Sequence, residues 1–152
     1  MARFEHELTL KCSPSSVFEF LLRPENIRRV SNPGMGLKFT SAPDVLSAGS
    51  QVQFEIVSFN QVHRITHEIE TVRPCELLVE RQVKGTMGAW IHTHRYEKTD
   101  GGVLVVDEID FELPGGILGM LLSEDSILDQ LEDGFEYRAQ QLERFVAEGT
   151  LA

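Results

Sequence analysis

Four side chains that could do chemistry or bind a polar group alternate along one short segment: Trp90, His92, His94 and Tyr96. If this segment is a β-strand, all four point to the same face, because alternate side chains of a strand share a face. A following segment carries Asp107 at the same alternation, among apolar residues that favour an inward-facing side. Imidazole and carboxylate groups that meet in apolar surroundings can bind a polar group or transfer a proton.

The turn between these two segments determines which residues pair across the strands. With Asp100-Gly101 as a two-residue turn, the segments form an antiparallel hairpin. Counting back from this turn predicts the cross-strand pairs His94–Asp107, His92–Ile109 and Trp90–Phe111. A turn one residue later would place Asp107 opposite Tyr96 instead, still on the same face.

The predicted pairing of His94 with Asp107 has three interpretations. The default is structural, because a buried imidazole and a buried carboxylate satisfy each other's hydrogen bonds inside a sheet. In the second interpretation, the pair orients a polar group of a bound ligand. In the third, Asp107 fixes the tautomer of His94 and raises its basicity, so that His94 acts as a general base. We favour them in that order.

The spacing of His92 and His94 also fits a metal ion, since imidazoles about 6–7 Å apart on one strand can share one. The third ligand would have to be Asp107 or His67. His63 and His67 share a face but lie about 13 Å apart, too far to join one small site. Because no closed ligand set forms, we predict that the protein binds no metal. The sequence has no Gly-rich phosphate loop and no nucleophile elbow, and we predict no cofactor.

The elements that position these residues follow from the hydrophobic periodicity. An alternating first strand over residues 4–12 precedes two short helices, one with Ser13 as its cap and Pro14 at its first position, the other over Glu25–Val30. Alternating segments separated by turn residues then predict about six more strands between Leu37 and Leu113. Their short connections indicate antiparallel hairpins.

A long amphipathic helix ends the chain. Ser126 is its predicted N-cap, and Asp129 completes a capping-box pattern. This helix is the only large apolar element that can cover the sheet, so the predicted fold class is α+β. The expected architecture is a curved antiparallel sheet of about six or seven strands wrapped around the helix. Such a sheet leaves a concave space of the kind that binds small molecules.

Two segments carry unusual patterns. After Arg73-Pro74, the alternation of Leu77, Val79 and Val83 places the charged Arg81 on the inward face.

The apolar residues of 117–122 are expected to pack over the end of the sheet. The alternative is a lid or portal that contacts a lipophilic ligand or a membrane. Three acidic residues argue against stable membrane docking: Glu124, Asp125 and Asp129.

Length and composition narrow the function classes. The 152 residues fit a single domain over 1–152, and the formal net charge of −10 disfavours nucleic acid and anionic membranes as partners. No segment reads as a signal peptide or as a membrane-spanning helix. The two cysteines match no metal or redox spacing. We therefore expect a cytoplasmic protein with reduced thiols and no stable membrane insertion, present as a monomer or homodimer.

The segment Lys84–His94 resembles the K-G-P-x-x-x-W-x-H-x-H signature of one branch of the SRPBCC superfamily, with Thr86 in place of the proline. Further matches extend over nearly the whole chain: Ser13-Pro14-x-x-Val17-Phe18, Pro24-Glu25-Asn26, Asp107, Phe111-x-Leu113-Pro114-x-Gly116 and Phe135-x-Tyr137-Arg138. The superfamily comprises the helix-grip proteins, among them START lipid-transfer domains and polyketide cyclase/dehydrase-like, coenzyme-Q-binding and birch-pollen-allergen-like proteins. The resemblance implies a deep, mainly apolar ligand cavity between sheet and helix. It fixes no single activity and assigns no role to Tyr137 and Arg138.

We predict that the protein binds a lipophilic or aromatic small molecule, for transport or sequestration. The residues expected to line the cavity and orient the ligand are Phe54, His67, Trp90, His92, Tyr96, Ile109, Phe111, Leu131 and Phe135. One alternative is a cyclase/dehydrase-like enzyme in which His94 and Asp107 are catalytic. Another is an interaction module whose acidic surface docks a basic protein partner.

Overall fold

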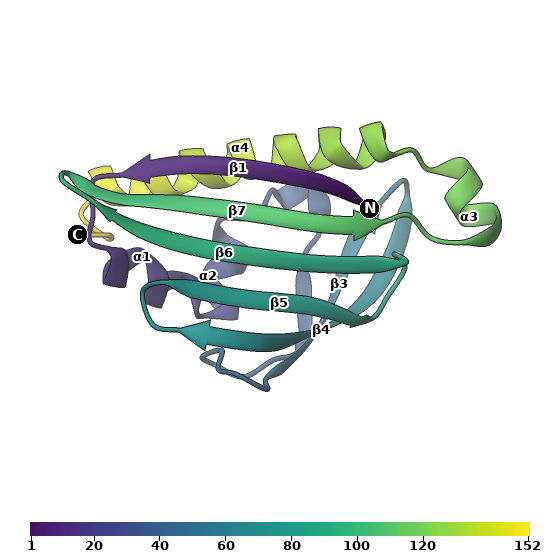
Figure 1. Ribbon diagram of the computed structural model, residues 1–152, viewed down its shortest axis with the longest axis horizontal. Helices are drawn as coiled ribbons and strands as arrows, with labels where there is room; N and C mark the ends of the chain where they lie inside the picture. The colour runs from purple at the N-terminus through teal and green to yellow at the C-terminus, as the bar shows by residue number, and fades with distance from the viewer.

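A computed structural model describes residues 1–152, and its central feature is one seven-stranded antiparallel sheet that curves around a long helix (Figure 1). The strand order is β1-β7-β6-β5-β4-β3-β2. The strands are β1 (Ala2–Leu10), β2 (Lys38–Ser41), β3 (Gln51–Ser58), β4 (Gln61–Arg73), β5 (Leu77–Lys84), β6 (Ala89–Thr99) and β7 (Gly102–Glu112). The helices are α1 (Pro14–Leu21), α2 (Pro24–Arg29), η1 (Pro33–Met35), α3 (Gly116–Leu121) and α4 (Glu124–Ala147). The predicted α+β arrangement is confirmed.

The first of the two short helices after β1 begins as the sequence predicts, and the second begins one residue earlier. The Ser13 side chain accepts a hydrogen bond from the Ser16 backbone N–H, and Pro14 occupies the first helical position of α1. Pro24 plays the same part in α2, which starts one residue earlier than expected. None of the helices combines the length and the apolar character that crossing a membrane requires.

The prediction for the start of α4 is wrong. Ser123, not Ser126, is the N-cap, and Ser126 takes the third helical position of a reciprocal capping box. The earlier start also places Glu124 and Asp125 in the first turn, where negative charge is favourable. Asp129 therefore lies within the helix and has no part in the capping box.

The β6–β7 hairpin has the predicted register. Thr99 pairs with Gly102 around the Asp100-Gly101 turn, which excludes the turn one residue later. The three predicted cross-strand pairs are all present: His94–Asp107, His92–Ile109 and Trp90–Phe111. These two strands therefore place their polar residues side by side near the middle of the sheet.

The predicted inward face of β5 is wrong. Glu80 lies opposite His92 on β6 and faces the interior, whereas Arg81 faces outward and forms ion pairs with Glu68 (3.4 Å) and Glu70 (3.7 Å). The apolar residues that suggested the opposite face, Leu77, Val79 and Val83, alternate with the cavity-lining Leu78, Glu80 and Gln82. The inner face of β5 is partly polar, since it carries Glu80 and Gln82. The alternating apolar residues of this strand therefore form its outer face.

The apolar segment after the sheet packs only in part: Leu118, Leu121 and Leu122 border the cavity, as the portal alternative expects, but much of the segment stays exposed. Helix α3 extends beyond the ends of the strands (Figure 1), and Ile117, Met120 and Leu121 are 79%, 84% and 76% exposed. The break at Leu113-Pro114-Gly115 turns the chain away from the sheet, and Gly116 at φ 68° uses a backbone conformation that favours glycine.

Gly102 provides a test of the hairpin that sets the site register. A Cβ added at Gly102 would overlap the backbone carbonyl oxygen of Leu10 on β1, whereas one added at Gly101 meets nothing within 4 Å. Gly102→Ala should therefore lower the free energy of unfolding by about 1–3 kcal/mol, as overpacking does. Gly101→Ala is the matched control and should change stability by less than about 0.5 kcal/mol. Urea denaturation of both variants checks this, and equal midpoints would contradict it.

Candidate functional site

A cavity of about 510 Å³ lies between the concave face of the sheet and helix α4. Hydrophobic residues make up 26 of its 41 lining residues, so most of the wall offers no hydrogen bond. The lining includes most of the residues expected from the sequence: Phe54, His67, Trp90, His92, Tyr96, Ile109, Leu131 and Phe135. Phe111 is the exception, because it is fully buried beside its cross-strand neighbour Trp90, with ring centroids 5.9 Å apart.

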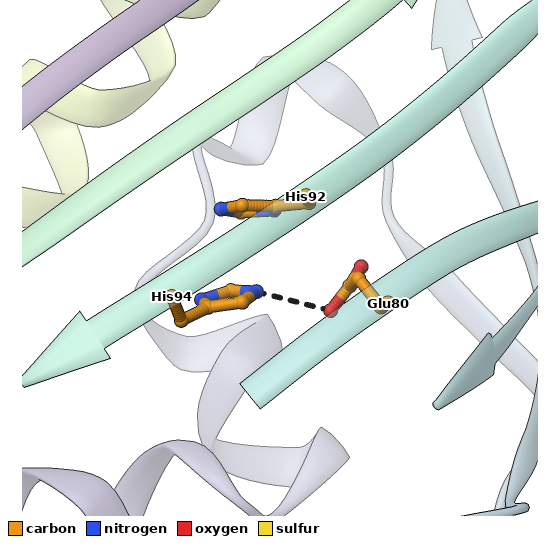
Figure 2. A group of neighbouring side chains, drawn as sticks. All are labelled: Glu80, His92 and His94. Atoms are coloured by element: carbon orange, nitrogen blue, oxygen red, sulfur yellow. Dashed lines mark hydrogen bonds and ion pairs between the residues drawn. The ribbon is translucent and has the colours of Figure 1, made fainter. Parts of the chain in front are cut away.

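A polar cluster interrupts the apolar wall at the middle of the sheet. It combines Glu80 of β5, His92 and His94 of β6, Asp107 of β7 and Arg138 of α4. Figure 2 shows His92 and His94 stacked on one strand, with Glu80 on the neighbouring strand. The two imidazole rings are 3.6 Å apart at their centroids and 23° from parallel.

His94 is held between two carboxylates. Its Nδ1 lies 3.1 Å from Asp107 Oδ1, and its Nε2 lies 3.1 Å from Glu80 Oε2 (Figure 2). Burial alone would lower the pKa of His94, but the hydrogen bonds to Asp107 and Glu80 outweigh it and raise the pKa to about 9. His94 is therefore an imidazolium at neutral pH, and both of its N–H groups donate to carboxylates.

His92 has the opposite state. Its Nε2 donates to Asp107 Oδ1 over 2.8 Å, while burial and the positive charge of His94 lower the pKa of His92 to about 4. No protein group bonds its Nδ1, and no buried side-chain nitrogen or oxygen is left unsatisfied. Nδ1 is consequently open to the cavity that His92 lines, and it carries a lone pair, because the proton of the neutral ring sits on Nε2.

The two carboxylates stay ionised despite burial. Burial raises the pKa of Asp107, but Arg138, whose Nη1 lies 3.5 Å from Asp107 Oδ1, and the two histidines hold that pKa well below its ordinary value. The pKa of Glu80 is also held well below its ordinary value, since hydrogen bonds to His67 (2.9 Å) and His94 outweigh burial. Two carboxylates thus balance the cations of His94 and Arg138.

Glu80, His92 and His94 also form the one group of side chains whose ligand atoms lie close enough to hold a metal ion, within 4.8 Å of one another. Glu80 takes the position that the sequence assigned to Asp107 or His67. Stacked, nearly parallel rings aim their lone pairs in separate planes, and His94 uses both nitrogens as donors. An ion would require the loss of the His94–Glu80 hydrogen bond and the rotation of one ring, so the absence of a bound metal stays our prediction.

Comparison with known proteins rests on solved structures. No protein-family model matches the chain, and no curated protein matches it. The protein TTHA0849 from Thermus thermophilus is 17% identical, with a TM-score of 0.76 over 97% of this chain and 99% of that one. Ara h 8.0201 is 14% identical, with a TM-score of 0.67 over 97% and 98%. The chain has the helix-grip fold.

A third helix-grip structure is the di-domain ARO/CYC StfQ from the steffimycin biosynthetic pathway. It is 10% identical, with a TM-score of 0.76 over 96% of this chain and 50% of StfQ. At such identities the likeness establishes the fold, which is the fold that the resemblance to SRPBCC proteins implied. The activity has to be argued from the site itself.

Sequence reasoning missed two members of the helix-grip polar cluster. Glu80 was overlooked because the apolar alternation of β5 marks the outer face. Arg138 was singled out only within a motif, and the structure gives it a contact: it is the cationic partner of Asp107, with its guanidinium 5.3 Å from the Phe135 ring centroid. The sequence did offer a signal for Arg138. A basic residue on an otherwise apolar helix face indicates a buried carboxylate partner, and Asp107 on the inward face of the sheet was the candidate.

The raised pKa of His94 predicts how the stability of this helix-grip chain depends on pH. A group whose pKa rises from about 6.5 to about 9 on folding stabilises the fold fully below pH 6.5, and this contribution is lost as the pH rises through 9. Between pH 7 and 9.5 the free energy of unfolding should fall by about 2 kcal/mol more in the wild type than in His94→Gln. Urea denaturation across this range measures the difference, and parallel pH curves for the two proteins would refute the assignment.

Proposed function

We propose that the protein binds a lipophilic or aromatic small molecule in the cavity between the sheet and α4. The observation that carries this proposal is the cavity itself: about 510 Å³, mostly apolar, with polar groups gathered on one part of its wall. Small-molecule sites have this size and this combination of apolar lining with a few placed polar groups. We further propose that the protein acts in the cytoplasm as a monomer or homodimer, without a cofactor and without nucleic acid as a partner.

Gly134 supports the binding proposal. It lies in the middle of α4, where glycine costs roughly 1 kcal/mol of stability relative to alanine. Gly134 lines the cavity, and a Cβ built there would meet nothing within 4 Å. A side chain at this position would project into the cavity, so the glycine keeps space open at a cost in helix stability.

Filling the cavity should abolish binding. In Gly134→Phe the ring would occupy the cavity, and we expect at least a tenfold weaker affinity for the neutral fluorophore N-phenyl-1-naphthylamine, with unchanged helix content. Gln140→Phe, which adds the same ring at an exposed position of α4, is the matched control and should bind as the wild type does. Fluorescence titration and circular dichroism measure both quantities.

Native mass spectrometry of the wild type before and after gentle organic extraction should identify a bound ligand by its mass. Equal affinity of Gly134→Phe and wild type for the fluorophore would contradict binding in this cavity. The absence of any fluorophore binding by the wild type would argue against an aromatic ligand.

Acid–base catalysis of the cyclase/dehydrase kind is the second candidate, favoured by one observation. Asp107 fixes the Nε2–H tautomer of His92 and leaves Nδ1 as a lone pair open to the cavity, the arrangement that a general base requires. Both nitrogens of His94 donate to carboxylates, so we assign the proton acceptor to His92 rather than to His94. Asp107 remains the residue that positions the base and fixes its tautomer, now acting on His92.

A simple carbon acid tests this second candidate. If His92 takes a proton from carbon, the protein should accelerate deuterium uptake from D₂O into the methyl group of 2-acetylnaphthalene, followed by NMR. The rate should be constant from pH 6 to 8, because His92, with a pKa of about 4, is already deprotonated there. A rate that rises towards pH 9 would return the role to His94, and no acceleration over buffer would leave binding alone.

A further inference from the structure

The chemistry of the cavity wall at His92 restricts which ligands fit. His92 is held from behind, since its Nε2 donates to Asp107 over 2.8 Å, and its ring stacks on His94. The ring also meets Phe135 edge to face, with centroids 5.8 Å apart. These contacts fix the ring plane, so the lone pair on Nδ1 has one direction in the cavity.

The proton position on His92 follows from its partner. A carboxylate only accepts hydrogen bonds, so the N–H of the neutral ring must be at Nε2. Nδ1 is then an acceptor with no donor of the protein to satisfy it. A ligand that fills the cavity displaces water from this nitrogen and must supply a donor itself, because an unmade buried hydrogen bond costs about 1–3 kcal/mol.

The charges near His92 disfavour an ionised ligand. Glu80 and Asp107 are balanced by His94 and Arg138, and their charged atoms are already engaged with one another. A carboxylate placed against Nδ1 would oppose lone pair to lone pair. A ketone or an ether presents the same mismatch, whereas a neutral hydroxyl donates to the nitrogen.

We propose that the cavity selects apolar ligands that carry a neutral hydroxyl, such as phenols, enols and hydrophobic alcohols, and that His92 Nδ1 accepts the hydrogen bond of this hydroxyl. The inference rests on the proposed binding function and adds to it the chemical class of the ligand. Sites built to pair with a hydroxyl discriminate strongly against analogues that lack it, since the polar group of the protein is left unpaired.

Two probes of similar shape test the proposal: 2-naphthol, which has a hydroxyl, and 2-methoxynaphthalene, which cannot donate. The wild type should bind 2-naphthol at least about tenfold more tightly, as expected for one buried hydrogen bond. In His92→Gln the amide nitrogen can still donate to Asp107, but no acceptor remains at the Nδ1 position. The preference for 2-naphthol should then fall to less than about threefold, with little change for 2-methoxynaphthalene.

Two further variants make the assignment specific to His92. His67 is also held by a carboxylate, Glu80, through its Nδ1, and it lines the cavity. His67→Asn keeps a donor towards Glu80 and removes Nε2, so a loss of the preference in this variant but not in His92→Gln would overturn the proposal. His6 lies outside the cavity lining, but its ring meets Phe135 with centroids 5.4 Å apart. His6→Gln therefore tests whether a change in the packing of Phe135 alone alters the preference, and it should keep the wild-type preference.

Isothermal titration calorimetry gives all of these affinities. Equal binding of both probes by the wild type would refute the hydroxyl selection while leaving the cavity-binding function intact. Failure of both probes and of N-phenyl-1-naphthylamine to bind would instead reject the binding function itself. A preference that survives in His92→Gln would show that another group accepts the hydroxyl.

Discussion

One oxygen atom, Asp107 Oδ1, organises the site. It accepts a hydrogen bond from His92 (2.8 Å) and forms ion pairs with His94 Nδ1 (3.1 Å) and with Arg138 of α4 (3.5 Å). A buried carboxylate is costly unless it is paired, and three donors from two elements offset that cost here. The same contacts join the middle of the sheet to the long helix on the far side of the cavity. Loss of Asp107 would leave Arg138 without its carboxylate partner in an apolar wall, and His94 would retain only Glu80.

The two histidines of β6 differ in protonation because of their neighbours. They sit two residues apart on one face and stack on each other, so two adjacent imidazolium charges would repel. His94 reaches both Glu80 and Asp107, and it therefore holds the proton. His92 reaches Asp107 alone and stays neutral. The cluster thus fixes one cation and one free acceptor in adjacent positions, which no spacing of the sequence alone could assign.

The parts of the site that the sequence predicts are those set by local rules. The Asp100-Gly101 turn fixes the β6–β7 register, and strict alternation then determines which of His92, His94 and Asp107 share a face. Glu80 escaped prediction because the face of β5 depends on its pairing with β6 and on two register shifts in its pairing with β4, which leave Val83 of β5 and Glu70 of β4 without a partner. Bulges of this kind reverse the face without a clear signal in composition. The cap of α4 was misplaced for a related reason, since Ser123 and Ser126 each fit one position of the same capping box.

The protonation state of His92 also helps to decide between the two proposed functions, ligand binding and acid–base catalysis. A general base works best when its pKa lies near the working pH, and a base with a pKa of about 4 holds its proton weakly at pH 7. Its lone pair nevertheless accepts a hydrogen bond from a hydroxyl, which keeps its own proton. The positive charge of His94 that makes His92 a poor base leaves it neutral and oriented, as a binding group should be. Catalysis would need a ligand that changes the ion pairs of the cluster. If the ligand moved the cation of Arg138 or His94 away from Asp107, the pKa of His92 would rise. Without that shift, the arrangement favours recognition of a hydroxyl over removal of a proton.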